Sequence, residues 1–342
     1  MINLVLIFAS ALILVLGATP IVRKIAGRLG MVDRPDARRV HLSPVPLLGG
    51  IAIYIGFIVA LLLFGEGWVL SQAISIFIGA TIVSFLGIWD DRWGVRPILK
   101  LLGQAIAATI VILSGVQVSF LPNQALNLFI TFIWILGITN ALNLLDNMDG
   151  LSGGVGAVAA AFFLLLAALN GQYLVASLAA ALLGVCIGFL VYNFNPASIF
   201  MGDAGSMFLG FVLAVVGIKL RFPGHPNVIT WMIPVVVLGL PIFDTTLIVV
   251  SRLRRGINPL TNPGKDHVSH RLVALGLSQR RAVIGLYGVC CALGLVGLLI
   301  MGASLLPAYS LGIAVFLIGV ASLIGLERVT LTGGAGGSRA EH

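Results

Sequence analysis

The chain has 342 residues, of which 59% are hydrophobic and only 9% carry a charge. With a mean hydropathy of +1.11, this composition excludes an ordinary soluble domain. The formal net charge of +8 is divided among short segments, which argues against a nucleic-acid footprint and favours an orientation signal in a membrane protein.

Apolar runs that could cross a bilayer recur along the whole chain. A spanning helix needs about 20 apolar residues to cross a hydrocarbon core of about 30 Å. We predict an all-α polytopic membrane protein, with one integral membrane domain over residues 1–329 and a flexible cytoplasmic tail over 330–342. The eleven predicted spans are 2–22, 47–64, 70–89, 98–114, 126–145, 151–169, 174–192, 205–220, 228–250, 283–301 and 307–326.

Lysine and arginine are concentrated in alternate connecting segments, with eighteen on one side and only Lys219 and Arg221 on the other. The positive-inside rule places the eighteen in the cytoplasm, which puts the N-terminus outside the cell membrane and the C-terminus inside. Eleven of the twelve carboxylates also fall on the cytoplasmic side, and Glu66 is the exception. The three cysteines lie inside spans and imply neither a disulfide nor zinc.

Acids at the cytoplasmic ends of the spans are the main functional signal. Placing a carboxylate beside hydrocarbon costs several kcal/mol unless it is paired or bound to a metal. We therefore expect these acids to hold a cation, which favours an enzyme or an ion-coupled transporter over a passive scaffold. They are Asp90, Asp91, Asp146, Asp149, Asp203 and Asp244.

Asp90 and Asp91 close the third run. Adjacent helical residues point about 100° apart, so the two acids have different tasks, one touching a metal and the other orienting it or a lysine. The alternative is a solvated helix end with Arg92 and Arg96 as partners.

The fifth run ends in a polar stripe, in which Asn140, Asn143 and Asn147 recur at spacings of three and four residues. The stripe predicts a face toward the bundle, and Asn side chains can read a nucleobase or sugar edge through both donors and acceptors. An interhelical hydrogen-bond seam also explains the asparagines. It does not explain the two further acids, Asp146 and Asp149.

Asp203 precedes the eighth run, within Gly202-Asp203-Ala204-Gly205-Ser206. In one interpretation Asp203 is the N-cap of the following helix, with Ser206 in the first turn. In the other, Asp203 meets Asp90 or Asp91 and shares a metal with it.

Asp244 lies well inside the ninth run and needs a partner there. Pro241 can open the helix near it. Contact with a ligand and an ion pair with an arginine both remain open for this residue, and the candidate partners are Arg252, Arg254 and Arg255.

The last cytoplasmic segment holds His267 and His270, flanked by Lys265, Asp266 and Arg271. These side chains fit a pyrophosphate clamp, although a plain basic loop is the alternative. Two histidines without a local cysteine make zinc the weaker idea. Acids that offer only oxygen favour Mg²⁺, usually held by one or two carboxylates together with substrate phosphates.

Taken in order, these motifs resemble the polyprenyl-phosphate N-acetylhexosamine-1-phosphate transferases. The resemblance covers the chain from Arg23 to Arg281. It rests on five groups of residues: Asp33-Arg34-Pro35 with His41, Pro44-Val45-Pro46 and Gly49-Gly50; Asp90-Asp91 with Lys100; Asn140-Ala141-Leu142-Asn143 with Asp146, Asp149, Gly150 and Leu151; Gly202-Asp203-Ala204-Gly205-Ser206; and His267 with His270-Arg271.

The resemblance implies roles for individual residues. Asp90, Asp91 and Asp203 would surround Mg²⁺, with Mn²⁺ as an alternative. Lys100 would lie close to the lipid phosphate. The nucleotide would be near Asn143, Asp146 and Asp149, and the diphosphate or sugar near His267, His270 and Arg271. Asn140 and Asp244 join the predicted substrate-binding residues, and the predicted catalytic residues are Asp90, Asp91, Asp203, His267 and His270.

The implied activity transfers a sugar 1-phosphate, expected to be GlcNAc-1-phosphate, from a UDP-sugar to undecaprenyl phosphate, with UMP as the second product. An apolar groove would take the isoprenoid tail at the bilayer, and a homodimer is left open. Ser269 stands where the family often has histidine, which argues against the alternative of a phospho-MurNAc-pentapeptide transferase. An ion-coupled transporter is the rival class, disfavoured because the acids gather at one end and no repeat is evident.

Overall fold

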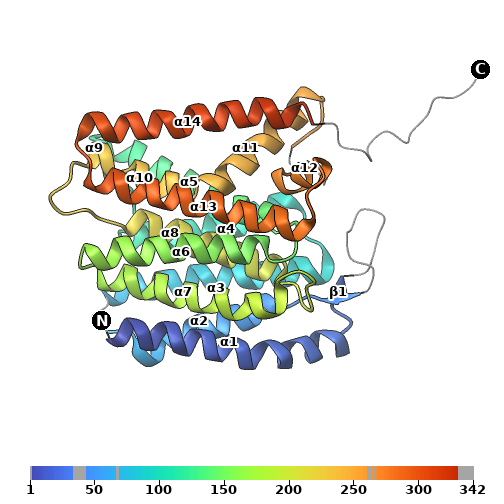
Figure 1. The fold of residues 1–342 in the computed structure, drawn as a ribbon. Coiled ribbons are helices and arrows are strands. Elements are labelled where there is room, and N and C mark those ends of the chain that lie inside the picture. Colours follow the sequence, from blue (N-terminus) through green and yellow to red (C-terminus); the bar gives the residue numbers. More distant parts are fainter. Residues whose placement is uncertain (1, 34–43, 67–68, 260–263, 265, 330–342) are drawn as a thin grey trace, which may run out of the picture.

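The computed structural model describes residues 2–33, 44–66, 69–259, 264 and 266–329. Its long helices run roughly parallel in one bundle, with α1 along one edge and α14 along the opposite edge (Figure 1). The helices are α1 (Ile2–Arg28), α2 (Gly49–Phe64), α3 (Leu70–Trp93), α4 (Pro97–Leu113), α5 (Gln124–Leu145), α6 (Leu151–Leu169), α7 (Tyr173–Asn193), α8 (Gly202–Lys219), α9 (Asn227–Thr230), α10 (Met232–Val237), α11 (Gly239–Arg254), α12 (Val268–Ala274), α13 (Gln279–Gly302) and α14 (Leu305–Glu327).

Every predicted apolar run coincides with a helix or, for 228–250, with the bent group α9 to α11. Within the described residues, eight helices are long and apolar enough to cross a membrane, or nine if the bent group is one span. Helices α2 and α4 are also apolar but shorter, with 16 and 17 residues. The prediction of an all-α polytopic membrane protein is confirmed, whereas the tail over 330–342 lies outside the described residues.

The ninth predicted span is broken near the proline that was expected to open it. Residues Asn227–Val237 and Gly239–Arg254 meet at an angle of 70°. Pro241 has no N–H to donate to the carbonyl four residues earlier, and its ring crowds that carbonyl, so a kink of this kind is expected just before it. The bend places Asp244 in the second turn of α11, where it is fully buried.

Two small elements lie outside the helix prediction. The short strands β1 (Val32–Asp33) and β2 (Val45–Pro46) pair antiparallel, and α12 is a seven-residue helix between α11 and α13. The carbonyl of Pro46 accepts a hydrogen bond from Phe200 N–H, and Phe200 C=O accepts one from Gly49 N–H, each at 2.9 Å. The β1–β2 pair therefore fixes the segment that leads into α8.

Helix α8 is the centre of the bundle and is buried along nearly its whole length. Its principal neighbours are α3 and α5. Close packing against α3 depends on Gly87, because a Cβ there would overlap the backbone of Asp203 and Ala204. Small residues at such crossings let membrane helices approach closely enough to gain van der Waals contact. The crossing brings the last turn of α3 against the first turn of α8.

We expect Gly87→Ala to lower the unfolding temperature in detergent, because the methyl group must push α3 away from α8. Overpacking of this kind typically costs about 1–3 kcal/mol. Gly137→Ala is the matched control, since a Cβ at this helical glycine of α5 would meet nothing within 4 Å. Thermal unfolding of the two purified variants measures the difference, and an equal effect of both substitutions would contradict the close crossing.

Candidate active site

The centre of the candidate site is a lysine between two aspartates from different helices. Lys100, in the first turn of α4, places its Nζ 2.8 Å from Asp90 Oδ2 and also contacts Asp203 Oδ2. Asp90 lies in the last turn of α3, where its Oδ1 accepts a hydrogen bond from Val95 N–H. Side chains of α3, α4 and α8 therefore meet at the ammonium group of Lys100. They lie at the end of the bundle where β1 and α12 are found (Figure 1).

Asp91 faces the start of α8. Its Oδ1 accepts the N–H of Asp203 at 3.0 Å, and its Oδ2 accepts the N–H of Ala204 at 3.3 Å. Amide groups in the first turn of a helix have no partner within the helix and carry partial positive charge, so an acid is stabilised there. Gly202 has φ +67°, and a Cβ on it would overlap the carboxylate of Asp91.

Of the two interpretations of Asp203, the one that makes it the N-cap of α8 is wrong. The N-cap position is Met201, and Asp203 is the second residue of the helix. The capping carboxylate comes from Asp91 across the bundle, which leaves Asp203 free to meet Lys100 and Asn143. Asn143 Nδ2 donates to Asp203 Oδ1 and to Ser206 Oγ, each at 2.9 Å. In line with the second interpretation, Asp203 lies beside the acids of α3, with its N–H bonded to Asp91 and Lys100 shared with Asp90; the shared metal stays a prediction.

Asp146 follows α5 and makes no hydrogen bond or ion pair through its side chain with the described residues. Burial raises the pKa of Asp146 well above its usual range, and the nearby charges of Asp203, Asp91 and Asp149 add to this. Its carboxyl thus lies beside the cluster without a fixed partner. A hydrogen-bonding ligand would find a carboxyl without a fixed partner there.

Asp149 and Asn140 have partners within the protein. Asp149 Oδ2 accepts Asn195 Nδ2 at 2.9 Å and Ala197 N–H at 3.0 Å. Asn140 exchanges amide hydrogen bonds with Gln104 of α4, at 2.6 and 3.2 Å. The seam interpretation therefore describes Asn140 in this structure. Gln104 was not singled out from the sequence, although a lone amide in an apolar run is the signal that marks it.

The histidines lie at the start of α12, held by a buried acid. Asp244 Oδ2 is 2.8 Å from His267 Nδ1, and its Oδ1 accepts Val268 N–H at 2.7 Å. The rings of His267 and His270 are 5.7 Å apart, centre to centre. Of the two alternatives left open for Asp244, the arginine pair is not the observed contact, because the bend at α11 turns this acid toward His267. The asparagine stripe reaches the same segment, where Ser269 Oγ donates to Asn147 Oδ1 at 2.6 Å.

The segment before the histidines is held by two arginines at the end of α11, Arg252 within the helix and Arg255 directly after it. Arg252 forms two hydrogen bonds with the carboxylate of Asp266, each 2.9 Å, and Arg255 adds one at 2.8 Å. Burial by itself raises the pKa of Asp266, but the hydrogen bonds and charge of Arg252 outweigh it and lower that pKa to about 2. Asp266 is therefore a fixed anion whose role in this structure is to anchor the segment.

Arg271 is buried and directs its guanidinium to Ser251 and to Glu327 of α14, both at 2.8 Å. Its predicted contact with the diphosphate, like every other predicted role of a site residue, stays a prediction. Lys265 and His41 lie outside the described residues. Sequence reasoning missed Glu327, for which the signal is an acid at the end of the last apolar run.

Within the described residues, no group of three or more His, Cys, Asp or Glu side chains is arranged to hold a metal ion. The donor set nevertheless fits Mg²⁺ in its chemistry, because Asp90 and Asp203, which meet here, offer carboxylate oxygens. One or two such carboxylates suffice for Mg²⁺ when water and substrate phosphates complete the shell.

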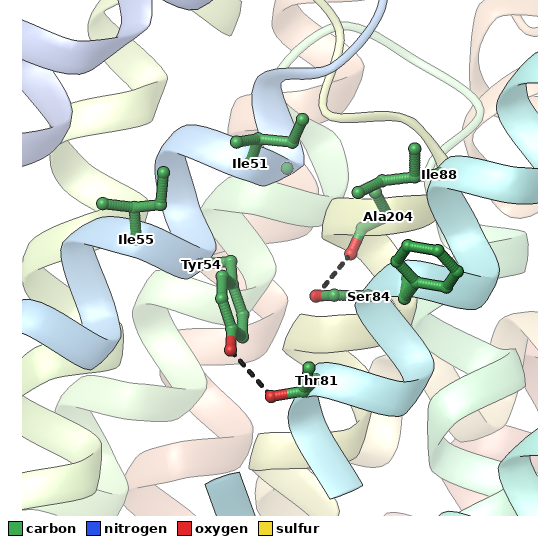
Figure 2. Close-up of a pocket in the computed structure, with 9 residues that line it drawn as sticks. Ile51, Tyr54, Ile55, Thr81, Ser84, Ile88 and Ala204 are labelled. Carbon is green, nitrogen blue, oxygen red and sulfur yellow. Dashed lines mark hydrogen bonds between the residues drawn. The ribbon is translucent and has the colours of Figure 1, made fainter. Parts of the chain in front are cut away.

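An apolar groove of about 240 Å³ lies on the outer face of α2 and α3 beside this cluster. Figure 2 shows Ser84 directed to the carbonyl of Ala204, at 3.4 Å, and Tyr54 bonded to Thr81 at 2.7 Å. The N–H of Ala204 bonds to Asp91, so the groove begins next to the acids. Its lining suits hydrocarbon better than a nucleotide, and the position of an isoprenoid tail stays a prediction.

Comparison with known proteins identifies relatives that match most of the chain. A model of the family described as Glycosyl transferase family 4 matches residues 73–221. The chain is 35% identical to the probable undecaprenyl-phosphate N-acetylglucosaminyl 1-phosphate transferase of Bacillus subtilis, over 84% of this chain and 82% of that protein. It is 33% identical to the decaprenyl-phosphate N-acetylglucosaminephosphotransferase of Mycolicibacterium smegmatis, over 95% and 87%. The undecaprenyl-phosphate alpha-N-acetylglucosaminyl 1-phosphate transferase of Haemophilus influenzae is 32% identical, over 81% and 82%.

We expect Asp266→Asn to destabilise the protein at neutral pH. A carboxyl whose pKa falls from 3.8 to about 2 on folding contributes about 2 kcal/mol, present above the unfolded pKa and lost as the pH falls toward the folded value. Thermal unfolding of wild type and variant should therefore differ by a constant amount above about pH 5, and the difference should shrink below that pH and vanish only near about pH 1.

Glu66→Gln is the control for this comparison, because Glu66 is exposed and belongs to the opposite end of the bundle. Its unfolding temperature should follow the wild type at every pH. A difference between wild type and Asp266→Asn that is absent at neutral pH, or that persists at the lowest pH, would contradict the anchoring role of Asp266.

Proposed function

The chain belongs to glycosyl transferase family 4, and we propose that it transfers GlcNAc-1-phosphate from UDP-GlcNAc to undecaprenyl phosphate or a similar polyprenyl phosphate. An oxygen of the lipid phosphate attacks the β-phosphorus of the nucleotide sugar, and the bond from that phosphorus to the α-phosphate oxygen breaks. The products are the lipid-diphosphate sugar and UMP. The names of the three relatives, which give undecaprenyl phosphate or decaprenyl phosphate as the acceptor, support the acceptor and the transferred GlcNAc-1-phosphate group.

The single observation that carries the proposal is the meeting of Asp90, Lys100 and Asp203 at the end of a membrane bundle. Phosphoryl transfer asks a protein mainly for alignment and for neutralisation of charge. A lysine held between two acids can meet the phosphate of a lipid whose tail stays in the bilayer. The histidine segment lies at the same end, where His267 and His270 can contact the diphosphate of a water-soluble donor.

Individual roles follow from the contacts. Lys100 is the candidate ligand of the acceptor phosphate, because phosphate oxygens can replace the carboxylates that now surround its ammonium group. Asp91 orients Asp203 by fixing the start of α8. Asp146 offers a carboxyl without a fixed partner for the donor nucleotide. Asp244 sets the orientation of His267 through Nδ1, which leaves Nε2 of that ring for the substrate.

Mg²⁺ belongs to this proposal as the cofactor, with Asp203 and Asp90 as the carboxylates that would hold it and Asp91 as their neighbour. When bound, the ion would neutralise the charge of the donor diphosphate. Asn143 holds Asp203 Oδ1 through its amide, so it keeps that carboxylate in one orientation whether its partner is Lys100 or a metal.

The membrane topology is also part of the proposal. We infer eleven spans, counting the bent group once and including α2 and α4, with the candidate site on the cytoplasmic face of the inner or plasma membrane. The distribution of lysine and arginine supports this orientation. A cytoplasmic site gives the enzyme access to a nucleotide sugar, and no observation favours the peptidoglycan enzyme or an ion-coupled transporter. A homodimer stays a prediction.

UMP release by purified protein, given undecaprenyl phosphate, Mg²⁺ and a panel of UDP-sugars, tests the activity. We expect UMP with UDP-GlcNAc, none after chelation of the metal, and a loss of about 100-fold or more in Asp203→Asn. Lys100→Met should lose activity in the same assay, because no cation would then hold the acceptor phosphate.

Glu66→Gln is the control, since this acid is exposed and remote from the cluster, and it should keep wild-type activity. Each variant must elute as a single species in detergent. Well-folded wild type that releases no UMP from any donor would overturn the proposed function, and UMP release without metal would overturn the role of Mg²⁺.

Labelling of single cysteines by a membrane-impermeant maleimide tests the topology in a Cys291→Ala background. Glu66→Cys should react in intact spheroplasts, because this loop position is predicted to be external. Arg254→Cys, whose native side chain is 69% exposed at the other end of the bundle, should react only after the membrane is opened. The reverse pattern would contradict the predicted orientation.

A further inference from the structure

Helix α14 buries little of its surface against the rest of the bundle. Among the described residues of α14, Ala308 is the one that is buried. Much of the helix exposes large apolar side chains such as Phe316 and Ile324. Its polar contacts are at the two ends. Near the start, Tyr309 Oη donates to Val228 C=O at 2.9 Å. At the other end, Glu327 is largely covered, with 10% of its side chain exposed.

The covered end of α14 is bound by Arg271 of α12. Arg271 Nη2 donates to Glu327 Oε1 at 2.8 Å, and Nη1 donates to Leu326 C=O at 2.6 Å. The same guanidinium donates through Nη2 to Ser251 Oγ at 2.8 Å and through Nε to Asp266 C=O at 3.1 Å. One buried arginine therefore ties the end of α14 to α11 and to the peptide that precedes His267.

Charge balance makes Glu327 the counter-ion of the Arg271 guanidinium. Four arginines gather here, Arg252, Arg254, Arg255 and Arg271, and the acids they contact are Asp266 and Glu327. Asp266 is occupied by Arg252 and Arg255. A buried guanidinium without its carboxylate is costly, so Arg271 would reorient toward any other anion if Glu327 were absent.

We propose that Glu327 is a positioning residue for the substrate diphosphate. By neutralising and orienting Arg271, it holds the 266–271 segment so that His267 and His270 keep the spacing at which they meet the donor. The proposal rests on the proposed function for the identity of the donor. The proposal gives the last helix, which buries few side chains, the task of holding the histidine segment in position.

Steady-state kinetics of Glu327→Gln tests the proposal. The substitution keeps the size of the side chain and removes its charge, and we expect the KM for UDP-GlcNAc to rise about tenfold while the KM for the lipid acceptor stays within about twofold. Glu327→Asp keeps the charge on a shorter chain and should restore part of the donor affinity. A merely structural defect would reduce the active fraction and leave both KM values unchanged.

Arg254→Ala is the matched control, because Arg254 contacts the same carboxylate at 3.5 Å with an exposed side chain. It should leave both KM values within about twofold of wild type. Equal donor KM values for wild type and Glu327→Gln, or equal rises for donor and acceptor, would overturn the proposal.

Hydrogen–deuterium exchange gives a second measurement that does not depend on activity. The 266–275 peptide should exchange faster in Glu327→Gln than in wild type, while a peptide from the start of α8 should exchange at the wild-type rate. If wild type releases no UMP, the proposed function fails and this comparison still decides whether Glu327 braces the segment. Unchanged exchange at 266–275, or faster exchange throughout the bundle, would overturn the proposal.

Discussion

The capping of α8 by Asp91 is the interaction on which the candidate site depends. Two amides of the first turn of α8 bond to a carboxylate of α3, at a crossing where Gly87 lets the two backbones meet. Because the start of a helix carries partial positive charge, an acid from another helix satisfies both its hydrogen bonds and its electrostatics. The cap brings Asp90 and Asp203 close enough to share Lys100.

The site has two parts that differ in how they are held. The acid cluster is built on the ends of long helices, which are rigid because packing along the bundle fixes them. The histidines lie at the start of the short helix α12, and a network of hydrogen bonds and ion pairs holds them instead, through Asp244, Asp266 and Arg271. Buried networks of this kind are costly to leave incomplete, so each member constrains the others. The family model ends before this second part, at residue 221.

Several features of the site could be predicted from the sequence because they depend on local pattern. Apolar runs of spanning length predicted the helices, and acids at their ends predicted a polar cluster at one end of the bundle. The partners of individual side chains could not be predicted in this way. Asp203 was a reasonable N-cap by its local sequence, and Asp244 was a reasonable partner for an arginine nearby in the chain. Neither of these two local interpretations describes the structure, because the deciding contacts come from other helices.

The sequence by itself therefore determined the class of the protein, its apolar helices and the gathering of acids at one end of the bundle, because an apolar helix satisfies its own backbone hydrogen bonds in hydrocarbon and charged side chains are costly there. Only the tertiary structure decided which acid caps α8, which acids pair with Lys100, and which amide bonds to Asn140. That amide belongs to Gln104. Such choices depend on helix crossings and on the 70° bend before Asp244. These set distances between residues far apart in the chain, which no local pattern encodes.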